Sequence, residues 1–325
     1  MDDNGINLII QKGYVFRHMT QILRNENSDY NDKIHMVLNK NQISFSVSRT
    51  KPKVLHEFIF KHDKLEEYTY NVFDKEGKKL DFITLSFNTT DIANATKNIG
   101  KKDIVKIRWK QYSTKLYFSK KNPTNIGDPE ITAIISCNHD PEYERPIINE
   151  KYYKKPHIKI KPKLFSNLCS QASSVKTSRL IIVYKPKVGI RFDGVNSANV
   201  LQFYKIYYFK NRKENETLEP LSQQWNFNLK DKDGRSIKIK DDSCIKFIIP
   251  SSTVKSLSKI HNIASTSSFL LFYFNKIKNL KDPSFQKFLK INSCMEGPCG
   301  DYNIYIHSEE TINHSFAACA EHNIN

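Results

Sequence analysis

Glycine is scarce in this sequence, with 10 residues among 325. The glycine-rich phosphate loops GxxxxGK[ST] and GxGxxG are absent, and so is the zinc-peptidase motif HExxH. No apolar run approaches the roughly 18 residues of a membrane span. The opening segment, residues 1–16, lacks the basic start and apolar core of a secretory signal. The sequence therefore gives no support for an enzyme, and we expect an intracellular protein with reduced thiols.

Positive charge dominates the composition instead. Lysine and arginine number 51 against 34 aspartate and glutamate, which gives a formal net charge of +17. A surplus of this size favours an anionic partner such as nucleic acid or an acidic membrane. Lysine greatly outnumbers arginine, and asparagine and isoleucine are abundant, which is also the coding bias of an AT-rich genome. Part of the charge surplus is therefore expected to be compositional.

The pattern of hydrophobic residues occurs twice along the chain. In the first half, apolar positions at helical spacing mark a helix over 13–25, and residues 85–109 read as strand, short helix, strand. The second half repeats this order, with a helix over 161–175 and a strand–helix–strand unit over 245–274. The repeat, offset by roughly 150 residues, predicts two topologically similar α+β domains. Their expected bounds are 1–137 and 157–308, with a linker over 138–156 and a tail over 309–325.

Three polar segments are expected to lie at the surface. Residues 138–156 are charged and contain three prolines, as an extended linker does. Residues 210–224 and 275–287 are polar or lysine-rich, and we expect them to be surface loops.

Two groups of residues have the side-chain types that bind metal, but not the usual arrangement. Cys294-x4-Cys299, with His314, Cys319 and His322 downstream, departs from the C-x2–4-C spacing of zinc sites. His139, Asp140, Glu142 and Glu144 gather in the charged linker, where solvated side chains are the simpler interpretation. We expect no metal and no cofactor.

The segment "NTTDIANATKNIGKKDIVKIR" (88–108) resembles, without a gap, a segment of the sliding-clamp family of proliferating cell nuclear antigen (PCNA). Five positions carry the residue types of that family: Asn88, Gly100, Asp103, Ile104 and Arg108. The segments "GYVFRHMTQILRN" (13–25) and "MEGPCGDYNIYIHS" (295–308) are also similar to its first helix and its closing hairpin. The likeness covers roughly residues 10 to 308.

The resemblance implies helices on one face of antiparallel sheets, with the polar side of each helix facing duplex DNA. The short helix within 85–109 carries Asn, Thr and Lys on that side, and we expect no acidic residue there, because a carboxylate would repel phosphate. The expected DNA-facing residues are Arg17, Arg24, Lys97, Lys101, Lys102, Lys163, Lys176, Lys255 and Lys259. Three residues depart from the family pattern: Asn94 stands where the family usually has a basic residue, and Asn167 and Ser170 stand where it tends to have arginine.

The resemblance also implies docking of short peptides from DNA polymerases and other replication or repair proteins. The apolar pair Ile147 and Ile148 is expected either to line that docking site or to fix the linker to its own sheet. Val47 lies in the segment that matches the family's pocket. Ring formation, as a homotrimer, is expected through edge strands near 116–121 and 179–185.

The function implied is that of a DNA polymerase processivity factor without catalysis. Two alternatives remain open: a monomeric processivity factor held on DNA by charge alone, and a clamp-fold transcription or repair adaptor that does not encircle DNA. The inserts and the AT-rich composition favour a large DNA virus as the source. The expected location is then the nucleus or a cytoplasmic site of viral replication.

Overall fold

The computed structural model describes residues 4–26, 33–50, 53–124, 130–143, 153, 155–175, 177–185, 189–198, 200–208, 245–265, 267–278, 285–296 and 300–309. The helices are α1 (Gly13–Glu26), α2 (Thr89–Thr96), α3 (Pro162–Ser174) and α4 (Ser251–Leu257), with 3-10 turns η1 (His62–Lys64) and η4 (Ile260–Asn262). The strands of the first half are β1 (Gly5–Ile10), β2 (Lys33–Asn39), β3 (Gln42–Thr50), β4 (Lys53–Lys61), β5 (Glu67–Asn71), β6 (Phe82–Asn88), β7 (Ile104–Lys110), β8 (Lys115–Lys121), β9 (Ile131–Ser136) and β10 (Asn138–His139). Those of the second half are β11 (Ile158–Ile160), β12 (Arg179–Lys185), β13 (Gly189–Val195), β14 (Leu201–Tyr208), β15 (Ile245–Pro250), β16 (Leu270–Lys278), β17 (Phe285–Cys294) and β18 (Gly300–Glu309).

The expected elements are present. The helices predicted over 13–25 and 161–175 are α1 and α3, and the two strand–helix–strand units are β6–α2–β7 and β15–α4–β16. The prediction of a surface loop over 275–287 is wrong for the residues at both ends of this range. There β16 and β17 continue as a paired hairpin, with Lys276 opposite Lys287 and Lys278 opposite Phe285.

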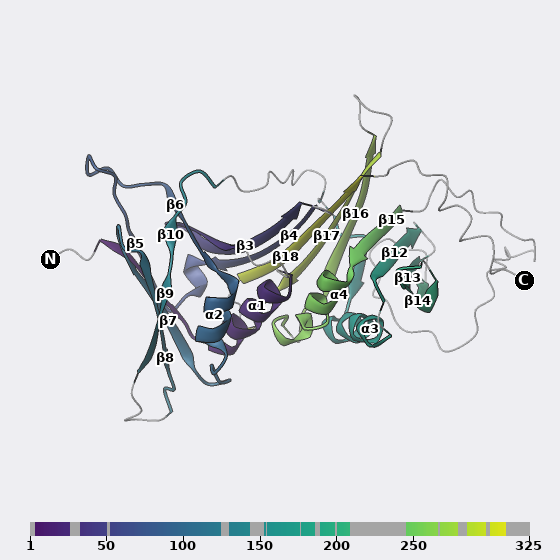
Figure 1. Ribbon diagram of the computed structural model, residues 1–325, viewed down its shortest axis with the longest axis horizontal. Helices are drawn as coiled ribbons and strands as arrows, with labels where there is room; N and C mark the ends of the chain where they lie inside the picture. The colour runs from purple at the N-terminus through teal and green to yellow at the C-terminus, as the bar shows by residue number, and fades with distance from the viewer. Residues whose placement is uncertain are drawn as a thin grey trace, which may run out of the picture.

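Three antiparallel sheets form the fold, and one of them runs through both halves of the chain (Figure 1). The order of the first sheet is β5-β1-β7-β8-β9, and that of the last is β14-β13-β12-β15. The central sheet has the order β10-β6-β2-β3-β4-β18-β17-β16-β11. In it β4 of the first half pairs with β18, the last strand of the second half. The two halves therefore share a continuous β-sheet, and each half contributes two helices.

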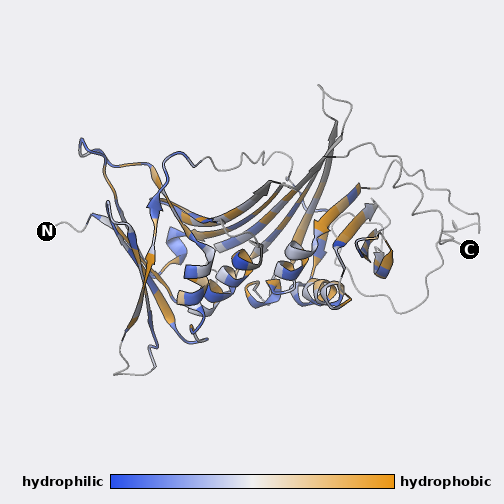
Figure 2. Cartoon of the chain, viewed as in Figure 1, coloured by the Kyte–Doolittle hydropathy of each residue, from blue (hydrophilic) through white to orange (hydrophobic). Residues whose placement is uncertain are grey.

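The four helices lie in one row, in the order α2, α1, α4, α3, on one side of the sheets (Figure 1). Each helix is amphipathic, as the mixture of hydrophilic and hydrophobic residues in Figure 2 shows. Their apolar sides are buried against the strands at Val15, Met19, Ile92, Phe165, Leu168, Val254 and Leu257. This burial supplies most of the helical stability, because helices as short as α2 and α4 do not persist alone in water.

Small polar side chains join neighbouring helices where they touch. Thr20 of α1 and Thr96 of α2 share a buried hydrogen bond of 2.7 Å between their hydroxyl oxygens. The Ser256 hydroxyl of α4 donates to the Ile22 carbonyl of α1 at 3.3 Å. On the other side of α4, the Ser166 hydroxyl of α3 donates to the Ser258 carbonyl. Serine and threonine are small enough to let the helices approach closely, and these bonds satisfy their hydroxyls without water.

Each sheet ends on two strands that have one unpaired side among the described residues, and two of these six edge strands lie at opposite ends of the molecule (Figure 1). These two edge strands are β9, which pairs with β8, and β14, which pairs with β13. The edges expected near 116–121 and 179–185 are wrong, because β8 and β12 are internal strands with a partner on each side. Each true edge lies farther along the chain from the strand that was expected.

Candidate nucleic-acid interface

The row of helices carries the cationic side chains that the sequence indicated. Those described as exposed are Arg24, Lys97, Lys101, Lys102, Lys163 and Lys255, and those partly buried are Arg17 and Lys259. Among the described side chains of the four helices, one carries the opposite charge, namely Asp91 in the first turn of α2. Asp91 is exposed, so the expectation that the polar side of this helix has no acidic residue is wrong. At the N-terminus of α2 its charge is stabilised by the helix dipole.

The turn between α2 and β7 is built by its own side chains and presents two lysines. The Asn88 side-chain oxygen Oδ1 caps α2 by accepting from the Thr90 backbone N–H at 2.7 Å. At the far end, the Asp103 carboxylate accepts from the Gly100 N–H at 2.8 Å. The resulting tight turn holds Lys101 and Lys102 at the surface beyond the helix. Three of the residues that carried the resemblance in this segment, Asn88, Gly100 and Asp103, therefore have a structural role.

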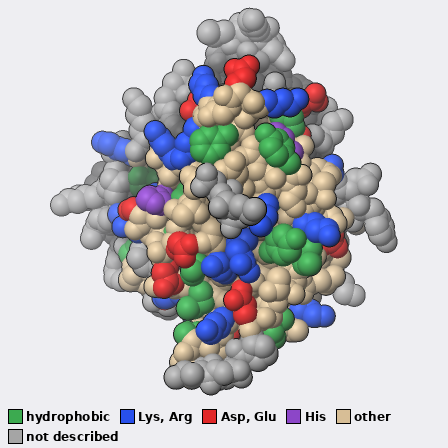
Figure 3. All heavy atoms as spheres, turned by 90° about the vertical axis from the view of Figure 1, so that its left-hand side faces the viewer, with side chains coloured by type: hydrophobic (Ala, Val, Ile, Leu, Met, Phe, Trp, Pro, Cys, Tyr) green, Lys and Arg blue, Asp and Glu red, His purple; other side chains and the backbone are tan. Residues whose placement is uncertain are grey.

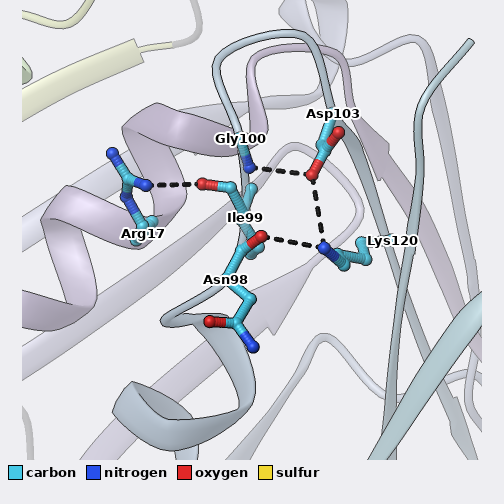
Figure 4. Close-up of polar contacts among 6 residues, drawn as sticks. All are labelled: Arg17, Asn98, Ile99, Gly100, Asp103 and Lys120. Carbon is cyan, nitrogen blue, oxygen red and sulfur yellow. Dashed lines mark hydrogen bonds and ion pairs between the residues drawn. The ribbon is translucent and has the colours of Figure 1, made fainter.

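Arg17 has a structural role in addition to its charge (Figure 4). Its guanidinium donates from Nη1 to the Ile99 carbonyl at 2.7 Å, which fixes the end of α2 to α1. Lys120 of β8 acts in the same way, donating to the Asn98 carbonyl at 2.8 Å and lying 3.7 Å from Asp103. Two basic side chains thus satisfy carbonyl groups in the turn that follows α2, close to the helix C-terminus, where cations are favoured.

A second group of cations lies where α1 meets α4. Arg24 and Lys255 are exposed, and both act on Lys259, which follows α4. The pKa of Lys259 is lowered, first by partial burial and then by the positive charges of Lys255 and Arg24. None of the described groups that shift this pKa is a carboxylate. Positive charge is therefore concentrated at this junction.

The positive charge does not extend evenly along α3. Lys163 is exposed in its first turn, but the neutral Asn167 and Ser170 occupy the next exposed positions. Lys176, which we also expected to face DNA, lies outside the described residues. The helix row is consequently most basic from the α2–β7 turn to the α1–α4 junction.

The outer end of the molecule has a different character. Figure 3 looks onto the end formed by the β5-β1-β7-β8-β9 sheet, where basic, acidic and hydrophobic side chains are interspersed. Arg108, on β7 of this sheet, lies 3.7 Å from the Glu130 carboxylate. Phosphate binding is thus better supported at the helix row than at this end.

The expected partner-binding residues do not form a described site. Val47 is 2% exposed, and its side chain belongs to the hydrophobic core, so the expectation of a surface contact there is wrong. On β3 it alternates with Ser46 and Ser48, which lie on the opposite face of the sheet. Ile147 and Ile148 lie outside the described residues.

The first residues of the expected linker, 138–143, add an edge strand to the central sheet and then contact its outer face. β10 pairs with β6, and the Asp140 backbone N–H donates to the Thr84 carbonyl at 2.9 Å. The Asp140 carboxylate is 3.5 Å from His35 Nε2, and the Tyr143 ring stacks on the His35 ring with 3.8 Å between centroids. Burial is the main reason that the pKa of His35 is lowered, and the negative charge of Asp140 acts in the opposite direction by raising it.

A second tyrosine, Tyr153, lies where the two halves of the chain join. Leu55, Tyr305, Lys290 and Tyr273 form one cross-strand row over β4, β18, β17 and β16. Tyr153 is 8% exposed and packs on this row, with its ring 5.8 Å from the Tyr305 ring and 6.3 Å from the Tyr273 ring. The Lys290 ammonium lies 5.1–5.8 Å from all three ring centroids, within the range of cation–π attraction.

Tyr143 and Tyr153 are functional candidates that sequence reasoning missed. The sequence signal was available, because large aromatic residues are unusual in a charged linker and bury readily. The adjacent apolar pair, Ile147 and Ile148, was the more conspicuous feature of the same segment. Each of these two tyrosines packs on the sheet, Tyr143 on His35 and Tyr153 on Tyr305, and the residues between them, 144–152, lie outside the described residues.

The described residues hold no group of three or more His, Cys, Asp or Glu that could bind a metal ion. Cys299, His314, Cys319 and His322 lie outside them, so most of the Cys294 arrangement is untested. Cys137 and Cys169 are free and buried, and burial raises the pKa of Cys137 to about 11. Within the same residues, every helix is too short or too polar to cross a membrane.

No known protein family and no curated protein matches this sequence. Among solved structures, the chain is similar to the crystal structure of the PCNA2–PCNA3 complex from Sulfolobus tokodaii, with a TM-score of 0.60 and 10% sequence identity. The match covers 92% of this chain and 98% of the other. The chain therefore has a PCNA-like clamp fold, α+β with two similar domains, as the sequence indicated.

Proposed function

We propose that this protein is a DNA sliding clamp, a non-catalytic processivity factor that encircles duplex DNA and tethers replication or repair proteins to it. The observation that carries the proposal is the row of four helices, whose cations lie on one side of a continuous sheet. Lysine and arginine on a helix row bind the phosphate backbone without reading base sequence. A clamp that slides along DNA needs binding of this kind.

Self-association into a ring is supported by the two edge strands. Large hydrophobic residues that are exposed cluster there, with Ile131 and Ile134 on β9 and Leu201 and Tyr204 on β14. An unpaired strand edge is a template for pairing with another chain. Pairing β9 of one copy with β14 of the next would extend the sheet and cover these side chains. Because the two edges differ, the contact is head-to-tail, and repeating it closes a ring if the rotation fits. The resemblance implies three copies.

Partner docking is supported by the outer face of the central sheet. This face is on the opposite side of the sheet from the helices, so a protein docked there would not compete with DNA for the helix row. Tyr143 and Tyr153 both pack on this face, Tyr153 at the junction of β4 and β18. A replication or repair protein could dock a short peptide on this face.

The DNA-binding surface is tested with two charge-matched variants. Neutralising Arg24, Lys97, Lys101 and Lys255 with glutamine removes four exposed cations from the helix row. The matched control changes four exposed lysines elsewhere to glutamine, namely Lys40, Lys75, Lys78 and Lys121. We expect the helix-row variant to lose affinity for duplex DNA and its salt slope to fall by about 0.9 for each lost phosphate contact. Equal loss in both variants would show that binding depends on net charge alone.

Encirclement is tested by the salt resistance of DNA complexes. A ring on closed circular DNA survives a high-salt wash and is released when the same DNA is linearised, whereas charge-held binding is lost from both forms. Release from circular and linear DNA alike would favour the monomeric alternative. No binding to either form in low salt would favour the adaptor.

A further inference from the structure

Two histidines lie at the junction of α1 and α4, among the cations already described. His18 is a partly buried residue of α1, and His261 is an exposed residue of η4, which follows α4. The ionisable groups that act on His18 come from both halves of the chain: Arg17 on its own helix, and Lys259 and His261 beyond α4. Tyr14 contacts the His18 ring edge-on, with 6.4 Å between centroids.

The contacts of His18 require a neutral ring. Arg17 Nη2 lies 3.3 Å from His18 Nε2, and a guanidinium can only donate, so Nε2 must accept. The proton is then on Nδ1, which lies 3.2 Å from the Gln21 side-chain oxygen and donates to it. Protonation of Nε2 would abolish the hydrogen bond from Arg17 and leave two cations side by side.

The hydrogen bond of His261 likewise shows which of its ring nitrogens carries the proton in the neutral ring. The Ser166 hydroxyl donates to the Ser258 carbonyl, so its oxygen accepts from His261 Nδ1 at 2.6 Å. In the neutral ring Nε2 is then the nitrogen without a proton. Protonation would add a donor at an exposed side chain of the helix row.

The described ionisable groups that act on His18 and Lys259 are all basic. The pKa of His18 is lowered by burial and by Arg17, Lys259 and His261, against the raising effect of its hydrogen bond with Gln21. The positive charges of Lys255 and Arg24 lower the pKa of Lys259 further, and no described carboxylate contributes to either shift. Like charges repel one another in the unliganded protein, and an anion among them would relieve the repulsion.

We propose that the α1–α4 junction is a proton-coupled phosphate site, in which a phosphodiester group of duplex DNA binds among Arg24, Lys255 and Lys259 while His18 and His261 each take up a proton from solvent. This inference rests on the proposed DNA binding and adds its regulation by pH. With His18 protonated, the Arg17 Nη2 donor loses its acceptor and becomes available to the phosphate. Binding and protonation strengthen each other, because each is favoured by the other's charge.

The direction of the pH effect follows from linkage. A bound phosphate raises the pKa of nearby histidines, so the complex holds more protons than the unliganded protein and affinity rises as pH falls. If DNA raises the pKa of one histidine by about one pH unit, affinity gains at most about tenfold from that residue. We expect DNA affinity to rise about tenfold between pH 7.5 and pH 5.5 at constant ionic strength.

The test measures binding of the intact chain to a short fluorescent DNA duplex by anisotropy from pH 5.5 to 8. Calorimetry in two buffers of different ionisation enthalpy then counts the protons taken up. The variants are His18→Gln, His261→Gln and the double variant, and the control is His62→Gln, an exposed histidine on η1. Glutamine keeps a side-chain acceptor for Arg17. The pKa values of both histidines, measured by NMR with and without DNA, give a readout that does not depend on the variants.

The proposal predicts proton uptake by the unmodified chain and by His62→Gln, and loss of most of the pH dependence in the double variant. In NMR, both pKa values should rise when DNA binds. The proposal is overturned if the double variant retains the full pH dependence, or if the two pKa values do not move. Tight binding that is independent of pH would reject this site but keep the proposed function. No binding at any pH would reject both.

Discussion

Leu55 and Tyr305 lie opposite each other on β4 and β18, and this pair joins the two halves of the chain. Tyr153 covers the pair from the linker side, with its ring 5.8 Å from the Tyr305 ring. The junction is thus held both by a strand ladder and by an aromatic side chain packed on its outer face. Its integrity determines whether the two helix pairs remain in one row.

Gly300 begins β18 at this junction and has no room for a larger residue. Its φ is +155°, and a Cβ atom would lie 1.8 Å from the Ile59 carbonyl oxygen of β4. We expect Gly300→Ala to reduce the free energy of unfolding by about 2–4 kcal/mol, because strand pairing must open to admit the methyl group. The measurement is urea unfolding. Gly77→Ala is the control, since its φ is +81° but nothing lies within 4 Å, and it should cost about 1–2 kcal/mol. Equal losses would show that backbone conformation, not the contact, sets the cost.

Arg17 and Lys97 should separate structural from DNA-binding roles. Arg17→Met removes the donor to the Ile99 carbonyl and should lower the free energy of unfolding by about 1–3 kcal/mol. Lys97→Met removes an exposed cation and should change it by less than about 0.5 kcal/mol. Both should weaken DNA binding. Urea unfolding and DNA anisotropy on the same preparations check this, and an Arg17 variant of unchanged stability would contradict it.

The edge strands should determine self-association. Tyr204→Lys on β14 and Ile134→Lys on β9 each place a charge on an exposed apolar position, Tyr204 being 49% and Ile134 58% exposed. We expect either change to shift the chain toward monomer in sedimentation velocity at micromolar concentration. Phe82→Lys is the control, because Phe82 is equally exposed, at 58%, but lies on neither edge. If both edge variants sediment like the unmodified chain, the ring contact is elsewhere or absent.

The aromatic ring of Tyr153, and not its hydroxyl, should hold the linker on the sheet. We expect Tyr153→Ala to cost about 2–4 kcal/mol of unfolding free energy, because loss of a large buried ring leaves Tyr305 and Tyr273 exposed. Tyr153→Phe keeps the ring and its attraction for Lys290, so it should cost less than about 1 kcal/mol. Thermal unfolding of the two variants gives the comparison. Similar losses in both would assign the stability to the hydroxyl group.

The sequence by itself determined the α+β class, the two similar halves and the helices, because hydrophobic periodicity is local. Val15 and Met19, for example, had to face a core once they recurred at helical spacing. It also located the cations of the helix row, since a polar position on an amphipathic helix is exposed wherever the helix packs. Burial of Phe165 and Leu168 followed from the same pattern.

Only the tertiary structure decided what depends on strand order and on distant side chains. Strands pair through backbone hydrogen bonds, which depend little on side-chain identity. The sequence therefore did not predict that β9 and β14 are edge strands while β8 and β12 are internal. The side of β3 on which Val47 lies was decided by the register, since a shift of one residue exchanges the two faces of a strand. The attachment of Tyr153 and the meeting of His18 with Lys259 join residues more than 100 positions apart. Such contacts form only when the whole chain folds.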